Sequence, residues 1–206
     1  NWLLLPEHFQ FAGGSVNQRR ESAEILGDGP AYKMCAEFAR QHGVYVHAGS
    51  IYEKVDGDPR VFNTTVAFGP SGEELARYRK IHLPGHGEYD PKRAFQHLEK
   101  RYFEPGDLGF PVWRTQDAVV GMLICNDRRW PESYRVLGLQ GVELVILGYN
   151  TPSVNSQDSR EDESRRLYHS ELSMTAGAYQ NATWVVGVAK AGDEDGHPLM
   201  GGSIIV

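Results

Sequence analysis

The sequence predicts a single domain of the mixed α/β or α+β class, and three observations lead to this prediction. Short apolar runs bounded by turn residues alternate along the chain with segments of helical period. With 206 residues, of which 40% are hydrophobic and 23% charged, the chain is long enough to bury one sizeable core. Residues 1–206 contain no internal repeat and no linker long enough to separate two domains, so they are assigned to one domain.

The N-terminal part is expected to contain four strands and one helix. The first strand covers residues 2–5. Residues 31–42 are predicted to be helical because Cys35, Phe38 and Ala39 recur at helical spacing toward a core, and Gly43 is a typical helix stop. Three further strands are expected over residues 44–51, 61–68 and 75–81, and they form a meander whose last strand brings Lys80 to its end.

The C-terminal part alternates between strands and helices. Residues 83–117 are rich in proline, aromatic and charged residues, and long ordered loops of this kind often build functional sites. The elements expected after this loop are strands at 118–124, 144–147, 183–190 and 203–206, and helices at 131–141 and 161–181, with Tyr168, Leu172, Thr175 and Tyr179 on one stripe of the second helix.

Charge, hydropathy and cysteine content exclude several classes of function. The formal net charge of −6 argues against a nucleic-acid partner, which requires a basic surface. No window approaches the apolar length of a membrane span, and the two cysteines are expected to be free thiols, so a cytoplasmic protein without a membrane partner is predicted. Because the chain begins with Asn1 and both ends fall in strands, we expect a fragment of a longer protein.

Cys125 is the first candidate for chemistry, since it follows a buried strand and precedes a helix. Backbone N–H groups at such a junction, together with Arg128 and Arg129, favour the thiolate form that a nucleophile needs. The alternative is a small buried hydrophobic residue.

Two other charged residues also stand at strand ends. Glu7 follows the first strand and Lys80 closes the meander. Strand ends in α/β folds converge on one rim, so Glu7, Lys80 and Cys125 are expected to meet there, although each taken alone could be a surface charge.

Motifs for other chemistries are absent or incomplete. His82 and His86 have the spacing of a helical metal pair, but Pro84 and Gly85 break that helix and no third ligand follows at a recognisable spacing. The sequence has no serine-hydrolase, phosphate-loop or dinucleotide motif. We therefore predict no metal site and no cofactor.

Three motifs together resemble the nitrilase, or carbon–nitrogen hydrolase, superfamily. They are Leu-Pro-Glu at residues 5–7, Tyr-Arg-Lys-Ile-His-Leu-Pro-Gly at 78–85, and Ile-Cys-Asn-Asp-Arg-Arg-Trp-Pro-Glu at 124–132. The segments 95–111, 148–152 and 176–181 are most similar to N-carbamoyl-D-amino-acid hydrolases, whereas residues 153–165 depart from that pattern. The resemblance implies an αββα sandwich, shortened here at both ends, and a homodimer or homotetramer in the full-length protein.

The resemblance also implies a role for each matching residue. Cys125 is the expected nucleophile, Glu7 the general base and Lys80 the residue that stabilises the oxyanion, with Glu99 holding Lys80 and helping to place water. The residues expected beside the substrate are His82, His97, Asn126, Arg128, Arg129, Asn150 and Thr151. The two arginines are candidates to bind the substrate α-carboxylate, and the alternative for one of them is an ion pair with Asp127 or Glu132.

The activity implied is hydrolysis of N-carbamoyl-D-amino acids to the D-amino acid, ammonia and carbon dioxide through an S-carbamoyl intermediate. Other amidases or ureidases of the superfamily, acting on N-carbamoyl-L-amino acids, N-carbamoyl-β-amino acids or aliphatic amides, are alternatives. A non-catalytic scaffold that keeps the fold is an alternative of a different class.

Overall fold

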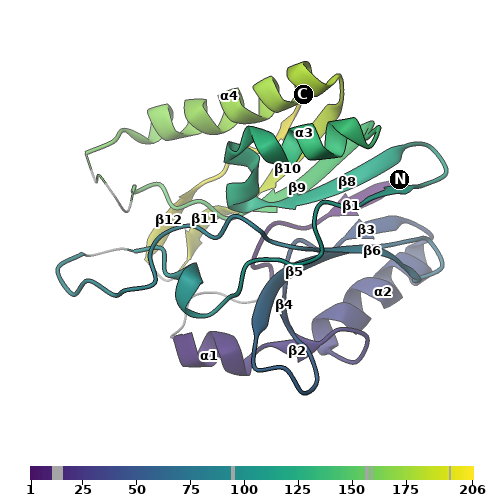
Figure 1. The fold of residues 1–206 in the computed structure, drawn as a ribbon, viewed down its shortest axis with the longest axis horizontal. Helices are drawn as coiled ribbons and strands as arrows, with labels where there is room; N and C mark the ends of the chain where they lie inside the picture. The colour runs from purple at the N-terminus through teal and green to yellow at the C-terminus, as the bar shows by residue number, and fades with distance from the viewer. Residues whose placement is uncertain (11–15, 94–95, 156–157, 159, 195) are drawn as a thin grey trace.

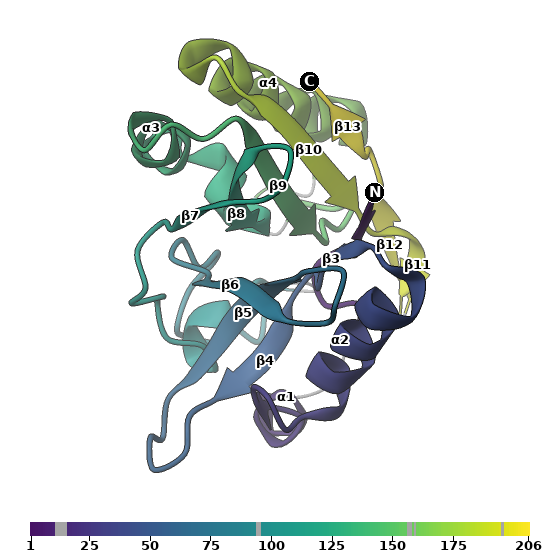
Figure 2. The ribbon, with the colours of Figure 1, turned by 90° about the vertical axis from the view of Figure 1, so that its right-hand side faces the viewer.

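Two β-sheets lie face to face at the centre of the fold, and helices cover their outer faces (Figure 1). The computed structural model describes residues 1–10, 16–93, 96–155, 158, 160–194 and 196–206. Figure 2 shows the same four layers from the side, with α3 and α4 outside one sheet and α2 outside the other. The predicted αββα sandwich is therefore confirmed.

The first sheet has six strands and carries α2 on its outer face. Its strands are β1 (Trp2–Leu4), β2 (Glu24–Ile25), β3 (Tyr45–His47), β4 (Ile51–Lys54), β5 (Val61–Phe68) and β6 (Glu74–Arg79), in the order β1-β3-β5-β4-β2 with β6 also paired to β5. The helix α1 (Val16–Glu21) precedes β2. The helix α2 (Pro30–His42) buries Ala31, Cys35 and Ala39 against the sheet and ends at Gly43, as predicted.

The predicted strand at residues 44–51 is wrong in one respect, because it is two strands. Both β3 and β4 pair with β5, but the chain is interrupted at Gly49, which has a φ of 55°. A side chain there would have its Cβ 2.1 Å from the carbonyl oxygen of Pro6, so only glycine allows this approach. The interruption brings the first sheet close to the backbone that carries Glu7.

The second sheet has a parallel centre built from two strand–helix–strand units. Its strands are β7 (Val112–Arg114), β8 (Val119–Ile124), β9 (Leu144–Tyr149), β10 (Trp184–Ala189) and β13 (Ile204–Ile205), in the order β13-β10-β9-β8-β7. The helices α3 (Pro131–Leu139) and α4 (Glu163–Asn181) connect β8 to β9 and β9 to β10. The strands β8, β9 and β10 are parallel, so their carboxyl ends lie at the same edge.

The main hydrophobic core joins the inner faces of the two sheets to α3 and α4. Ala67 and Tyr78 of the first sheet pack in one cluster with Met122, Ile146 and Val185 of the second. No helix in the described part of the chain is both long and apolar enough to span a membrane.

Several short elements do not follow from sequence patterns. The missed elements are α1, β2, β7 and a two-stranded hairpin formed by β11 (Ala191–Glu194) and β12 (His197–Met200). The stripe of Tyr168, Leu172, Thr175 and Tyr179 lies on the exposed side of α4. The buried side of this helix carries Arg166, Ser170, Met174, Gly177 and Ala178.

Candidate active site

Glu7 lies in a buried turn directly after β1, where both sheets approach the chain. Its side chain is 1% exposed. The carboxylate accepts hydrogen bonds from Asn63 Nδ2 at 3.0 Å and from the backbone N–H of Asn150 at 3.3 Å. Burial alone would raise the pKa of Glu7, but Lys80, His8 and a hydrogen bond from Cys125 lower it to about 2. Glu7 is therefore ionised and can accept a proton.

Lys80 is fully buried at the end of β6 and lies between two carboxylates. Its Nζ is 2.7 Å from Glu7 Oε1 and 2.8 Å from Glu99 Oε2, and Glu99 belongs to the 3₁₀ turn Glu99–Arg101. Burial opposes the charge of Lys80, but Glu7 and Glu99 raise its pKa well above the usual value. An ammonium held at a fixed position in a dry site is suited to stabilise an oxyanion.

Cys125 is the first residue of the 3₁₀ turn Cys125–Arg129, which follows β8. It has a φ of 45° and is 8% exposed. Non-glycine residues in this conformation are uncommon and often occur at functional sites. Its side chain lies close enough to Glu7 to lower the pKa of that carboxyl, so nucleophile and base are adjacent.

The strand–helix junction and the nearby arginines were expected to favour the thiolate of Cys125, but the pKa of this thiol is raised. Burial and the neighbouring Glu7 carboxylate raise the pKa of Cys125 to about 11, and the opposing effects of Lys80 and Arg128 are smaller. The resting residue is therefore a thiol, and Glu7 must remove its proton when the substrate is bound.

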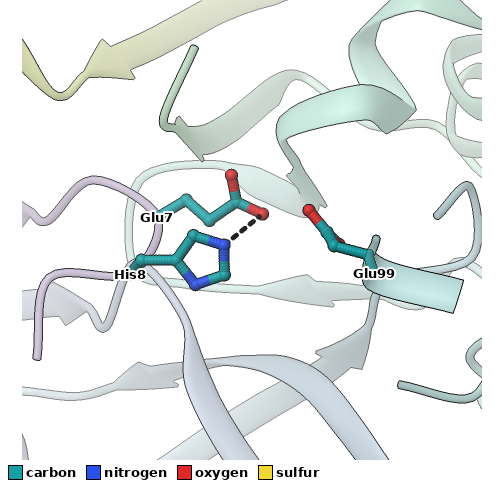
Figure 3. Close-up of side chains that lie close together, drawn as sticks. All are labelled: Glu7, His8 and Glu99. Atoms are coloured by element: carbon teal, nitrogen blue, oxygen red, sulfur yellow. Dashed lines mark ion pairs between the residues drawn. The ribbon is translucent and has the colours of Figure 1, made fainter. Parts of the chain in front are cut away.

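Glu7, His8 and Glu99 are grouped closely enough to hold a metal ion, with one ligand atom from each within 4.8 Å of the others (Figure 3). The His8 Nε2 atom points toward Glu7 Oε1 at 3.6 Å. However, the Lys80 ammonium contacts both carboxylates, so the position for a cation between them is already filled. The charges of this group fit a lysine side chain better than a metal ion.

His8 and Asn63 contact Glu7 but were missed by the sequence analysis. His8 is buried, has a φ of 54° and hydrogen-bonds Tyr52 through Nδ1 at 2.8 Å. Its position beside Glu7 in the sequence was the available signal. Asn63 lies inside β5, and nothing in its sequence context distinguishes it from other strand residues.

His82 is hydrogen-bonded to Asn126, the second residue of the Cys125–Arg129 turn. Asp127 is fully buried and accepts hydrogen bonds from His82 Nδ1 at 2.8 Å and from Tyr78 at 2.8 Å. The Asn126 side chain donates to the His82 carbonyl at 2.9 Å. Both residues border an open cavity of about 420 Å³ that also contacts Trp130.

The two arginines after Cys125 have different surroundings. Arg128 is fully buried, and its guanidinium donates to Ser170, to the Cys125 carbonyl and to Thr151, at 3.0, 2.7 and 3.0 Å. Arg129 is exposed and has no ion pair with any residue that the structure describes. The side chains of Arg128 and Thr151 thus hold each other in place through a hydrogen bond, whereas the guanidinium of Arg129 is available to bind a ligand.

His97 and Asn150 complete the set of residues expected beside the substrate. Desolvation, followed by the charges of Lys80 and of Arg129, lowers the pKa of His97 to about 4, so its imidazole is neutral near pH 7. Asn150 follows β9 and donates its backbone N–H to Glu7. The structure thus gathers Glu7, Lys80 and Glu99 by direct contact and places Cys125 beside Glu7, with His82, Asn126 and Asn150 adjoining them.

Comparison with known proteins identifies one family. The family model described as carbon–nitrogen hydrolase matches residues 1–206. A nitrilase from Pyrococcus abyssi is 32% identical over 98% of this chain and 67% of its own length. An N-carbamoylputrescine amidase from Solanum lycopersicum is 30% identical over 81% of this chain and 54% of its own length. The chain therefore spans about two thirds or less of these relatives.

A solved structure shares the fold. The crystal structure of a carbon–nitrogen hydrolase from Helicobacter pylori G27 superposes with a TM-score of 0.83 at 25% sequence identity. The match covers 100% of this chain and 70% of that one.

Proposed function

The chain belongs to the carbon–nitrogen hydrolase family, and we propose that it hydrolyses N-carbamoyl-D-amino acids through a cysteine S-carbamoyl intermediate. The single observation that supports this most strongly is the contact set of a buried thiol, an ionised carboxylate and an ammonium at one sheet edge. The resemblance of segments 95–111 and 148–152 to the D-amino-acid enzymes supports the choice of substrate.

In the proposed reaction, Glu7 removes the Cys125 proton while sulfur attacks the ureido carbonyl carbon. The oxyanion that forms is stabilised by Lys80, and Glu7 returns the proton to the departing ammonia. Glu7 then takes a proton from water as the oxygen attacks the S-carbamoyl carbon. The bond between this carbon and sulfur breaks, and Glu7 returns the proton to the Cys125 sulfur, while Glu99 keeps Lys80 in place. The carbamate released decomposes to carbon dioxide and the amino acid.

The experiment that tests this proposal measures ammonia release from matched N-carbamoyl-D- and N-carbamoyl-L-amino acids. D-selective release supports the proposed substrate class. Faster turnover of the L-enantiomers or of aliphatic amides contradicts it and favours another amidase, in line with the N-carbamoylputrescine amidase among the relatives. No release from any of these substrates favours the non-catalytic alternative.

Arg129 is proposed as the residue that binds the substrate α-carboxylate, because Arg128 already donates to three protein groups. Arg129→Gln is expected to raise KM for N-carbamoyl-D-phenylalanine by about tenfold or more, since a charge-assisted hydrogen bond is lost. The KM for propionamide, which has no carboxylate, should stay within about twofold. Arg114→Gln, at an exposed position of β7, is the control. An equal rise in both KM values would contradict this role.

We also propose that two copies of the chain associate through α3 and α4. Large apolar side chains are exposed on this surface: Val136, Leu139, Tyr168, Leu172 and Tyr179. Contiguous exposed apolar surface is typical of interfaces between subunits.

Light scattering after size exclusion tests this association. The wild type is expected to be a dimer or tetramer, and Leu172→Glu with Tyr179→Glu should shift it to a monomer because two charges would be buried. Met34→Glu places a charge on the exposed side of α2 and should leave association intact. A monomeric wild type at all concentrations would refute the proposal.

A further inference from the structure

The β11–β12 hairpin supports the loop that carries Asn150 and Thr151. Its strand β12 pairs with that loop, because Met200 N donates to the Thr151 carbonyl at 3.0 Å and Ser153 N donates to the Pro198 carbonyl at 2.7 Å. Lys190, between β10 and β11, donates its N–H to the carbonyl of Tyr149 at the end of β9, at 2.9 Å. Figure 2 shows the hairpin following directly beyond the end of β10. Side chains of the hairpin can therefore contact Asn150 and His8, the residues that lie beside Glu7.

Lys190 and Glu194 connect the hairpin to the side chain of Asn150. They form a part-buried ion pair, and the remaining carboxylate oxygen of Glu194 accepts a hydrogen bond from Asn150 Nδ2 at 3.3 Å. Lys190 also donates to the carbonyl oxygen of His8 at 3.0 Å, which ties the hairpin to the turn that carries Glu7.

The ion pair determines which way the Asn150 amide faces. An ionised carboxylate only accepts hydrogen bonds, so the amide must turn its NH₂ group toward Glu194. Its Oδ1 atom then faces away, is buried, and accepts no hydrogen bond from any group in the described part of the chain. A buried acceptor without a partner is costly, and here it belongs to a residue whose own N–H contacts Glu7.

We propose that Glu194 and Lys190 are positioning residues that fix the Asn150 amide so that its Oδ1 accepts a hydrogen bond from a substrate N–H group. This inference rests on the proposed function, because the ureido group is the N–H donor in question. The pair thereby selects substrates that donate at this point and disfavours those that present a carbonyl or ether oxygen.

Glu194→Gln tests the inference, because glutamine can either accept from or donate to Asn150 and no longer fixes its orientation. We expect KM for N-carbamoyl-D-phenylalanine to rise about tenfold, as for one lost hydrogen bond, while kcat stays within about twofold. Lys190→Gln, which frees Glu194 to move, should have the same kind of effect. Glu37→Gln breaks an exposed ion pair on α2 and is the matched control.

Two further measurements separate positioning from a general structural effect. Asn150→Ala should itself raise KM, and adding Glu194→Gln to it should raise KM no further, because the residue being positioned is gone. The oxygen analogue O-carbamoyl-D-phenyllactate lacks the internal N–H but keeps the terminal NH₂. A KM rise for the ureido compound alone assigns the contact to the internal N–H, and an equal rise for both assigns it to the terminal NH₂.

The outcomes also separate this inference from the proposed function. An active wild type whose KM is unchanged in Glu194→Gln overturns the inference alone. A fall in kcat without a change in KM, or additive effects in the double variant, does the same. A wild type inactive on N-carbamoyl amino acids and on amides overturns the proposed function and the inference with it.

Discussion

Cys125→Ala is expected to reduce ammonia release by at least about 10³-fold, because the reaction proposed here proceeds through a bond to the Cys125 sulfur. The Cys125 side chain is adjacent to the ionised Glu7, and its pKa of about 11 keeps it a thiol until substrate arrives. Acid quenching of the wild type during turnover should trap a carbamoyl adduct that mass spectrometry detects, and the variant should show none.

Cys35 provides the matched control for this experiment. It is also a buried thiol, and burial followed by the charge of Glu24 raises its pKa to about 12, but it lies in the core between α2 and the first sheet. Cys35→Ala should retain turnover and still form the adduct. Substantial activity in Cys125→Ala, or an adduct located on Cys35, would refute the role given to Cys125.

The fold could be predicted where the apolar pattern is long and regular. The eight buried residues of β5 and the helical spacing of α2 each carry such a pattern, and both elements lie where they were expected. Short elements such as β2 and β7 carry too few residues to show a period, and their pairing with neighbouring strands is what orders them. The break at Gly49 depends on the approach of Pro6, which lies beyond the end of β1 and which no local pattern reveals.

The sequence could predict which reactive residues form the candidate site, but not the protonation state of Cys125. Glu7, Lys80 and Cys125 stand at strand ends, and the structure brings them together. A junction between strand and helix favours a thiolate only where solvation or nearby positive charge outweighs the effects of burial and of neighbouring negative charge. Here the burial of the thiol and the adjacent carboxylate outweigh Lys80 and Arg128, and both effects arise from residues distant in sequence.

Lys80→Met is expected to abolish turnover and to lower the free energy of unfolding at pH 7 by about 3 to 5 kcal/mol, the usual cost of removing one partner from a buried ion pair. The ammonium of Lys80 contacts both Glu7 and Glu99, which are buried. Without it, two carboxylates face each other with little water to screen their charges. Lys33→Met, which breaks an exposed ion pair with Asp28, should change stability little.

The pH dependence of unfolding gives this prediction a distinctive sign. In the wild type the pKa of Glu7 is about 2, below its ordinary value of 4.5, so its contribution to stability is present above pH 4.5 and is lost as the pH falls toward 2. In Lys80→Met, burial and mutual repulsion should raise the carboxyl pKa values above 4.5 in the folded state. The folded variant then binds more protons than the unfolded chain, and its stability should rise as the pH falls from 7 to 5. Urea unfolding at both pH values measures this, and parallel slopes for the two proteins would show that Lys80 does not hold the carboxylates in their charged form.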